Sequence, residues 1–279
     1  MLHSLAWLYW NPPKEAFTIP FLNLPVMWYG ILFAFGFVCG YFILIPILRK
    51  SLPEKSREFS TLFADRITFF IVIGTIVGAR LGHVFFYDWP YYEAHPMEIL
   101  MIRNGGLASH GGTLGVIIAL LLFLRLNKNR FPGISFLFIV DMLVIPTAVA
   151  VTFIRLGNFF NQEILGNETT LPWGIIFGHA ADGSAPIPRH PVQLYEAAAY
   201  LATFFVLYPL WRIKRETLKP GLLSGIFFVL VFGSRFFIEF LKTPQESWLD
   251  GFGLQVGQYL SIPFVCFGLF LIFRPYSKK

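Results

Sequence analysis

Seven stretches of this sequence are apolar over a length that suits a membrane-spanning helix, which takes about 17 to 25 residues. Short polar segments separate them. The third stretch is the shortest, and it either lies with little tilt or starts before its first residue. The stretches cover approximately Pro25–Leu48, Ile67–Tyr87, Gly111–Leu126, Gly133–Phe153, Pro191–Trp211, Gly221–Leu241 and Gly257–Phe273.

The composition agrees with a lipid environment. Charged residues make up only 14% of the 279 residues, and hydrophobic residues make up 56%. A soluble domain carries about 25% charged residues to cover its surface. The surface of this chain must therefore face lipid. We predict an all-α integral membrane protein, in which residues 1–279 form a single bundle of seven transmembrane helices.

The distribution of lysine and arginine predicts the orientation of this bundle. Basic residues gather after the first, third and fifth stretches and at the C-terminus: Arg49, Lys50, Lys55, Arg57, Arg66, Arg125, Lys128, Arg130, Arg212, Lys214, Arg215, Lys219, Arg274, Lys278 and Lys279. The alternate segments carry Lys14, Arg103, Arg189 and Lys242. Because cytoplasmic loops hold the excess of positive charge, we expect the N-terminus outside and the C-terminus in the cytoplasm. The net charge of +6 therefore reports topology, and we expect no nucleic-acid partner.

The segments predicted to lie outside are also the longer and more irregular ones. Tyr87–His110 and Gly157–His190 are rich in glycine, asparagine, proline and aromatic residues. Loops of this length in a compact protein are usually functional. We therefore expect the functional site on the outer face.

Several polar side chains lie in or at the ends of the apolar stretches, where a charge near the bilayer centre costs roughly 2.5–3.5 kcal/mol. With the orientation above, all except Asp141 fall toward the outer halves of their helices. They are Arg80, His83, His110, Asp141, Arg155, Tyr195, Glu196, Arg235 and Glu239. The helices should therefore converge on one polar site near the outer leaflet.

Two helical spacings each leave an interpretation to be decided. Gly74, Gly78 and Gly82 form a stripe that favours close packing of another helix, which would hold Arg80 in place. Arg80 itself either reaches the outer interface or pairs with an acid. Arg235 and Glu239 stand four residues apart on one helix face. They are either a self-neutralising pair or an anion-binding arginine oriented by a carboxylate.

The segment from Arg155 to Gly166 reads RLGNFFNQEILG and is unusually polar for the end of a transmembrane helix. Gly157 and Gly166 permit tight turns, and Asn158, Asn161 and Glu163 offer hydrogen bonds in a partly dry place.

The segment Gly105–Gly112 reads GGLASHGG and places His110 among glycines. Histidine suits proton transfer near neutral pH, although a lone histidine is more often structural. The sequence has no HExxH motif and no histidine pair at metal-ligand spacing, so we expect neither a catalytic metal nor a cofactor.

These motifs, in this order, resemble the bacterial prolipoprotein diacylglyceryl transferase family over essentially the whole chain. Arg155 to Gly166 is similar to the family signature. The other matching blocks are Trp28–Gly30, Gly78–Gly82, Ser109–Gly112, Arg189–Glu196 and Arg235–Glu239. Two positions depart from the family pattern. Ile154 stands where the signature has glycine, and Val231 stands where the family often has a tyrosine.

The resemblance implies a transferase that moves a diacylglyceryl group from phosphatidylglycerol to the thiol of a lipobox cysteine in a prolipoprotein. A thioether forms and glycerol phosphate leaves. Such an enzyme works in the bacterial inner membrane, with its site toward the outer face. The nucleophile belongs to the substrate, so Cys39 and Cys266 are not needed for the chemistry.

The resemblance also suggests roles for individual residues. Arg155 and Arg235 would bind the phosphate and stabilise the leaving group, because a guanidinium pairs with phosphate at two points. His110 or Glu163 would be the base that takes the thiol proton. The remaining expected substrate-binding residues are Tyr29, Arg80, Asn158, Asn161, Gly166, Tyr195 and Glu239.

Two other functions remain open. A transporter or lipid-binding membrane protein would use the buried arginines to hold a ligand, although it should then have polar residues on both sides of the membrane. Another transferase could consume phosphatidylglycerol with a different acceptor, and only an acceptor assay separates that activity.

Overall fold

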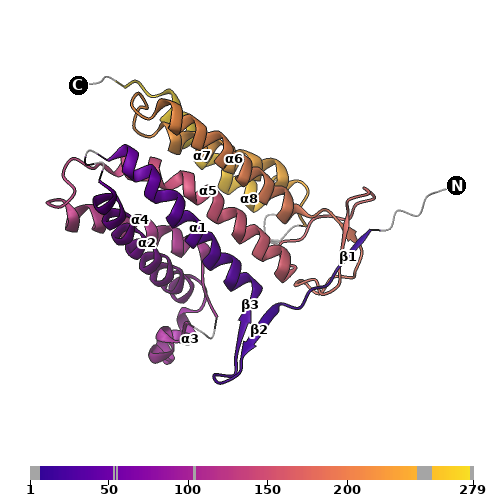
Figure 1. Ribbon diagram of the computed structural model, residues 1–279. Helices are drawn as coiled ribbons and strands as arrows, with labels where there is room; N and C mark the ends of the chain where they lie inside the picture. The colour runs from indigo at the N-terminus through magenta and orange to yellow at the C-terminus, as the bar shows by residue number, and fades with distance from the viewer. Residues whose placement is uncertain (1–6, 53, 55, 103–104, 244–252, 277–279) are drawn as a thin grey trace. The chain divides into compact units, whose positions relative to one another are not determined.

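The computed structural model describes residues 7–52, 54, 56–102, 105–243 and 253–276 (Figure 1). Within these residues, seven helices are long and apolar enough to cross a membrane, so the predicted seven-helix fold class is confirmed. They are α1 (Trp28–Ser51), α2 (Arg57–Phe86), α4 (Ser109–Asn127), α5 (Phe136–Asn161), α6 (Val192–Lys214), α7 (Leu222–Glu239) and α8 (Val256–Phe273). Of the basic residues used to predict the orientation, Lys55, Arg103, Lys278 and Lys279 lie outside the described residues.

Two helices extend well beyond the predicted apolar stretches. α2 begins at Arg57 because the side chain of Ser56 caps it, accepting a hydrogen bond from the backbone N–H of Phe59 at 3.1 Å. α5 continues through the polar residues to Asn161, eight positions past Phe153. The third stretch starts at Ser109, before the predicted Gly111. Hydropathy alone therefore did not predict the polar ends of these helices.

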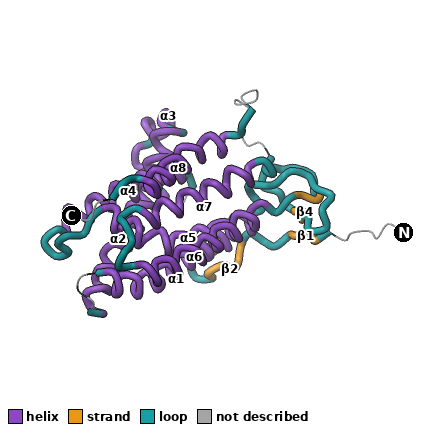
Figure 2. The backbone as a smooth tube through the Cα atoms, turned by 90° about the horizontal axis from the view of Figure 1, so that it is seen from above, coloured by secondary structure: helices purple, strands orange, loops and turns teal. Residues whose placement is uncertain are grey.

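Short strands and helices occupy the segments between the long helices. β1 (Leu8–Trp10) pairs in parallel with β4 (Ile175–Phe177), and β4 pairs antiparallel with β5 (Pro188–Arg189). β2 (Glu15–Ile19) and β3 (Leu24–Met27) form a separate hairpin, so Pro25 belongs to a strand and not to the first helix. A short helix α3 (Trp89–Ala94) and the 3-10 helix η1 (Pro96–Leu100) lie between α2 and α4. Figure 2 shows β1 and β4 beyond the ends of α5, α6 and α7.

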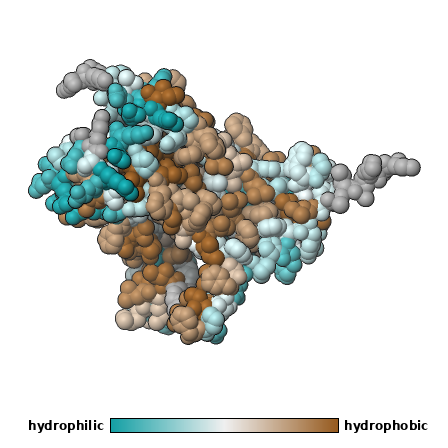
Figure 3. Space-filling view, in the orientation of Figure 1, coloured by the Kyte–Doolittle hydropathy of each residue, from teal (hydrophilic) through white to brown (hydrophobic). Residues whose placement is uncertain are grey.

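The chain divides into two compact units, which are described separately. The larger unit comprises Met1–Leu44 and Val140–Lys279, and the smaller unit comprises Ile45–Ile139. The helices carry many exposed apolar side chains, among them Phe42, Phe69, Phe205, Phe237 and Phe270. Figure 3 shows apolar surface in brown over much of the molecule. Apolar surface of this extent suits contact with lipid.

In the smaller unit, small residues let α2 and α4 pack at close range. A Cβ atom added to Gly74 would lie 2.6 Å from the Cβ of Ala119, and one added to Gly82 would lie 2.6 Å from the Cα of Gly111. A Cβ atom added to Gly78 would meet the backbone of Gly111 even more closely and would lie 2.7 Å from the Cα of Gly115. The packing role predicted for this glycine stripe is therefore confirmed.

In the larger unit, Asp141 caps the N-terminus of α7. It lies on α5, and its carboxylate accepts hydrogen bonds from the backbone N–H of Gly221 (2.6 Å) and from both the N–H and the hydroxyl of Ser224 (2.8 and 2.6 Å). These groups form the N-terminus of α7, where unpaired N–H groups and the helix dipole favour an anion. Asp141 therefore joins α5 to α7.

Replacement of Asp141 by alanine should lower the free energy of unfolding by about 2–3 kcal/mol, because buried donors lose a charged acceptor. Asparagine, which keeps an acceptor oxygen, should cost less. Thermal unfolding in detergent micelles measures both effects. The matched control is Glu216→Ala, which removes a carboxylate whose side chain is 79% exposed. Equal melting temperatures for D141A and the control would refute the capping role.

Candidate functional site

Four charged side chains form a cluster where helices of the larger unit end. Arg155 Nε on α5 lies 2.9 Å from Glu196 Oε2 on α6. Lys242 Nζ, just beyond α7, lies 2.9 Å from Glu196 Oε1 and 2.8 Å from Glu239 Oε2. The Glu196 side chain is fully buried, and that of Lys242 is 4% exposed. Two cations and two carboxylates thus compensate each other, which buried charges require.

The local sequence places these groups together for simple reasons. Glu196 lies in the second turn of α6, and Arg155 lies six residues before the end of α5, so the two charges meet where α5 ends and α6 begins. Gly257, near the start of α8, leaves room for the Glu239 carboxylate, since any side chain there would collide with it. The cluster therefore joins α5, α6, α7 and α8.

A second set of polar groups continues the cluster along the signature segment. Asn158 Oδ1 accepts a hydrogen bond from Arg155 Nη1 at 3.0 Å, and Asn158 Nδ2 donates to Glu163 Oε1 at 2.7 Å. Asn161 Nδ2 reaches the same oxygen at 3.3 Å. The predicted residues Arg155, Asn158, Asn161 and Glu163 are thus brought together, and Glu163 orients the amide that contacts Arg155.

The backbone around Glu163 is strained. Gln162 has φ 53° and Ile164 has φ 58°, a region that residues other than glycine rarely adopt and that is an outlier for a β-branched residue. Hydrogen bonds hold this turn in place: Gln162 Oε1 accepts from the N–H of His179 at 2.7 Å, and Gln193 Nε2 donates to the carbonyl of Glu163 at 2.7 Å. Strain that the surroundings maintain in this way is concentrated at functional sites.

Gly166 fastens the signature segment to the end of α7. It pairs with Lys242 in an antiparallel bridge, and the flanking Asn167 N–H donates to the carbonyl of Leu241 at 2.7 Å. A Cβ atom at Gly166 would lie 2.7 Å from the Cβ of His190. Gly166 is therefore required for a close approach of backbones, whatever it does for a substrate.

Arg235 lies beside this cluster without joining it. Its Nε is buried and has no hydrogen-bond partner, and in the described part of the chain no ion pair links Arg235 to a carboxylate. The expected partner, Glu239, pairs with Lys242 instead. Tyr200 of α6 interacts electrostatically with both Arg155 and Arg235. Arg235 thus supplies a positive charge that no carboxylate among the described residues neutralises.

Two further predicted tyrosines lie in the larger unit. The ring of Tyr29 on α1 packs over Gly157, where a Cβ atom would lie 2.8 Å from it. The hydroxyl of Tyr195 accepts a hydrogen bond from Trp173 Nε1 at 2.8 Å and lies 3.3 Å from His190 Nδ1. Burial lowers the pKa of His190. Its neutral ring can therefore accept a hydrogen bond from the Tyr195 hydroxyl at neutral pH.

His110 and Arg80 belong to the smaller unit. His110 is exposed at the N-terminus of α4, with its ring against Phe86 (5.7 Å between centroids) and Tyr87 (5.5 Å). A histidine presented in this way is open to a substrate. The cluster around Arg155 lies in the larger unit.

Among the described residues Arg80 forms no ion pair with an acid, and backbone carbonyls are its partners instead. Its place at the outer interface stays a prediction. It is 3% exposed, and its guanidinium donates to the carbonyls of Glu98 (2.6 Å), Gly105 (2.7 Å) and Ile99 (2.9 Å). It also lies over the ring of Tyr92 at 4.9 Å. Arg80 therefore organises the segment between α2 and α4.

Sequence reasoning missed Lys242 and the full role of Glu196. The charge pattern places Lys242 among the lysines of the outer segments, although it follows Glu239 by three residues at the end of a helix. A lysine three residues after a glutamate at a helix end is a signal that could have predicted the ion pair between Lys242 and Glu239. Among the described residues, no group of three histidine, cysteine, aspartate or glutamate side chains is placed to hold a metal ion.

The arrangement can bind an anion and stabilise added negative charge. Arg235 has no acidic partner among the described residues, Arg155 is fixed by Glu196 and Asn158, and Tyr200 interacts with both arginines. Guanidinium groups in a partly dry place hold phosphate or carboxylate strongly.

Comparison with known proteins gives one consistent family. The family model for prolipoprotein diacylglyceryl transferase matches residues 14–274. A phosphatidylglycerol–prolipoprotein diacylglyceryl transferase of Tolumonas auensis is 45% identical, with 98% of this chain and 99% of the relative covered. Proteins of the same name from Porphyromonas gingivalis (42% identical; 96% and 95% covered) and Protochlamydia amoebophila (41% identical; 98% and 96% covered) are also similar to it.

Proposed function

Because the chain belongs to the prolipoprotein diacylglyceryl transferase family, we propose that it transfers a diacylglyceryl group from phosphatidylglycerol to the cysteine thiol of a prolipoprotein. The thiolate attacks the carbon of the diacylglyceryl group that is bonded to the phosphate oxygen. The carbon–oxygen bond breaks, a thioether forms, and glycerol phosphate leaves with the bonding electrons. The observation that best supports anion chemistry in this site is Arg235, which carries a charge without an acidic partner among the described residues.

The proposed roles follow the contacts of each residue. Arg235 binds the phosphate and stabilises negative charge on the leaving group. Arg155 faces the same region and is held by Glu196 and Asn158. Asn161, Gly166 and Glu239 shape the pocket for the lipid head, and Tyr29 and Tyr195 line it. Arg80 contributes by holding the α2–α4 segment that precedes His110.

The seven helices act in this proposal as one catalytic domain in a bacterial inner membrane. The positive-inside rule supports an external N-terminus, a cytoplasmic C-terminus and a site toward the outer face. Phosphatidylglycerol already lies in the bilayer and can enter between helices, whereas the prolipoprotein peptide arrives from the outer side. The reaction itself needs no cofactor or metal, because both bonds change by displacement at carbon.

Release of glycerol phosphate tests the proposal. The purified protein in detergent should release glycerol phosphate from phosphatidylglycerol when a synthetic lipobox peptide is added. No release is expected with the same peptide in which cysteine is replaced by serine. Release that is independent of the thiol would point to a different acceptor, such as water.

His110 is the proposed base, and Glu163 is proposed to position Asn158. His110→Asn should lower kcat about 100-fold, the lower end for loss of a general base. Glu163→Gln, which keeps an oxygen that can accept from Asn158, should lower kcat much less than H110N does. Glycerol phosphate release at saturating substrate compares the two variants. If E163Q and not H110N loses about 100-fold in kcat, the two roles are exchanged.

The two cysteines of the chain should be dispensable. Cys39 is partly buried on α1 and Cys266 is exposed on α8, and both are free thiols. The double variant Cys39→Ala/Cys266→Ala should keep kcat/KM within about twofold of the wild-type value, since surface-like substitutions rarely cost more than about 0.5 kcal/mol. Glycerol phosphate release measures this. Abolished turnover in a folded double variant would mean that the enzyme supplies its own nucleophile.

A further inference from the structure

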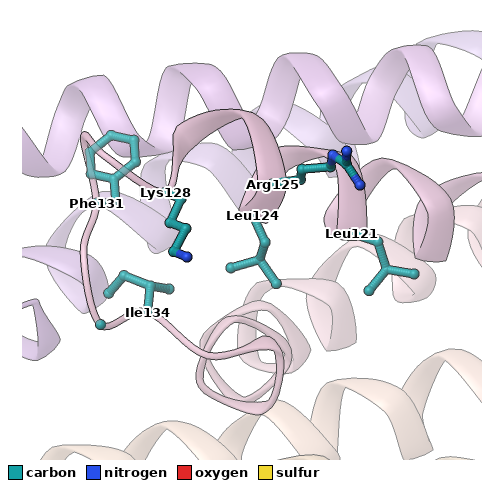
Figure 4. Close-up of a pocket in the computed structure, with 7 residues that line it drawn as sticks. Leu121, Leu124, Arg125, Lys128, Phe131 and Ile134 are labelled. Atoms are coloured by element: carbon teal, nitrogen blue, oxygen red, sulfur yellow. The ribbon is translucent and has the colours of Figure 1, made fainter.

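The smaller unit contains a hollow of about 480 Å³ at the C-terminal end of α4, the opposite end of that helix from His110. Residues of α4 and of the turn that follows it line this hollow (Figure 4): Leu121, Leu124, Arg125, Lys128, Phe131, Gly133 and Ile134. None of them belongs to the site described above.

The lining has an apolar part and a cationic part. Leu121, Leu124 and Lys128 follow one another at helical spacing, so they share one side of α4. Phe131 is 4% exposed and packs against Phe63 and Phe123. Figure 4 shows Lys128, Leu124 and Ile134 around the same space. Apolar and cationic side chains therefore lie next to each other in the lining of the hollow.

The shape of the turn is fixed by its backbone. The N–H groups of Arg130 and Phe131 both donate to the carbonyl of Asn127, at 3.0 and 2.9 Å. Gly133 has φ 77°, which favours glycine and lets the chain turn back toward Ile134. The hollow is thus built by an ordered turn.

The charges of the hollow are not balanced. The segment from Leu121 to Ile134 reads LLFLRLNKNRFPGI and contains three cations and no acid. Arg125 and Lys128 are exposed, and within the described ranges neither forms an ion pair. The negative C-terminal end of the α4 dipole, equivalent to roughly half a charge, offsets only part of these three positive charges. The hollow therefore attracts an anion.

We propose that this hollow binds an anionic phospholipid of the membrane. Its phosphate lies between Arg125 and Lys128, and one acyl chain runs along Leu124 and Leu121. The end of a membrane-spanning helix lies at the level of lipid phosphates, and basic residues near the surface attract anionic lipids. A free phosphate ion would use the cations alone and leave the leucines of the hollow unfilled. This lipid site is separate from the transferase site and does not depend on the transferase proposal.

Photocrosslinking tests the site in the intact protein. The probe is phosphatidylserine with a diazirine in one acyl chain, compared with phosphatidylcholine bearing the same chain, and mass spectrometry locates the label. Phosphatidylserine should label the Leu121–Ile134 segment several-fold more than phosphatidylcholine does. Arg125→Gln/Lys128→Gln should lower that label roughly 30-fold, because each of the two basic residues near the membrane surface contributes about 1 kcal/mol.

Two further variants make the result decisive. The matched control is Arg212→Gln/Lys214→Gln, which removes two exposed basic residues from the end of α6 and should leave the label unchanged. Leu124→Trp keeps both charges and fills the hollow, so it should also abolish the label even if R125Q/K128Q does not fold. Equal labelling by the two lipids, labelling that survives both hollow variants, or complete displacement by inorganic phosphate would each overturn the proposal.

Discussion

Replacement of Arg235 by glutamine is expected to lower kcat/KM for phosphatidylglycerol about 1000-fold while leaving the protein folded. The magnitude is that of losing a cation or donor that stabilises charge on a leaving group. The protein should stay folded because no described ion pair depends on Arg235, so no buried carboxylate is left uncompensated. Arg235→Lys, which keeps the charge but loses two-point binding, should recover only part of the activity.

The kinetic constants separate two ways in which Arg235 could act. A role in the transition state lowers kcat, whereas a role only in holding the lipid raises KM and leaves kcat unchanged. We expect mainly a fall in kcat. Arg212→Gln is the control, since Arg212 is an exposed arginine at the far end of α6. Wild-type kcat/KM in R235Q would remove Arg235 from the mechanism.

Lys242→Met should lower the free energy of unfolding by about 3–5 kcal/mol, because it leaves two buried carboxylates facing each other without their shared cation. Lys242 lies 2.9 Å from Glu196 and 2.8 Å from Glu239. For a chain of this size the melting temperature should fall by roughly 10 °C. Lys242→Arg, which keeps the charge, should lose much less.

A second substitution tests whether the charge is the cause. In Lys242→Met/Glu239→Gln, Glu196 still pairs with Arg155, and one uncompensated carboxylate has been removed. The double variant should therefore melt above K242M. Lys214→Met, at the exposed end of α6, controls for loss of a lysine. Melting of K242M within a degree of the wild type would show that the cluster does not hold these helices together.

The sequence alone was sufficient to predict the seven spans, because long apolar stretches leave few other choices. It also marked the polar segment in which Asn158 contacts both Arg155 and Glu163. The glycine stripe at Gly74, Gly78 and Gly82 had one physical use, close helix packing, and the structure confirms it. Asp141, the exception to the outer clustering, proved to cap α7 and not to take part in the site.

Pairings across the fold could not be predicted from spacing. Arg235 and Glu239 share a helix face at four residues, yet Lys242 at three residues takes the carboxylate because it also meets Glu196 from α6. Arg80 could be recognised as a buried charge, but its partners are carbonyls set by the conformation of Glu98 and Gly105. The short strands β1 and β4 pair residues about 167 positions apart, which no local pattern marks.

The most direct test of the transferase proposal is the mass of the peptide product. The purified protein is incubated with phosphatidylglycerol of defined acyl chains and a lipobox peptide, and the peptide is then fragmented in a mass spectrometer. We predict a gain of one diacylglyceryl unit, with both acyl chains, on the cysteine sulfur, and no gain when that cysteine is serine. A peptide carrying a single acyl chain or a phosphatidyl group, or an unmodified peptide beside consumed phosphatidylglycerol, would contradict diacylglyceryl transfer.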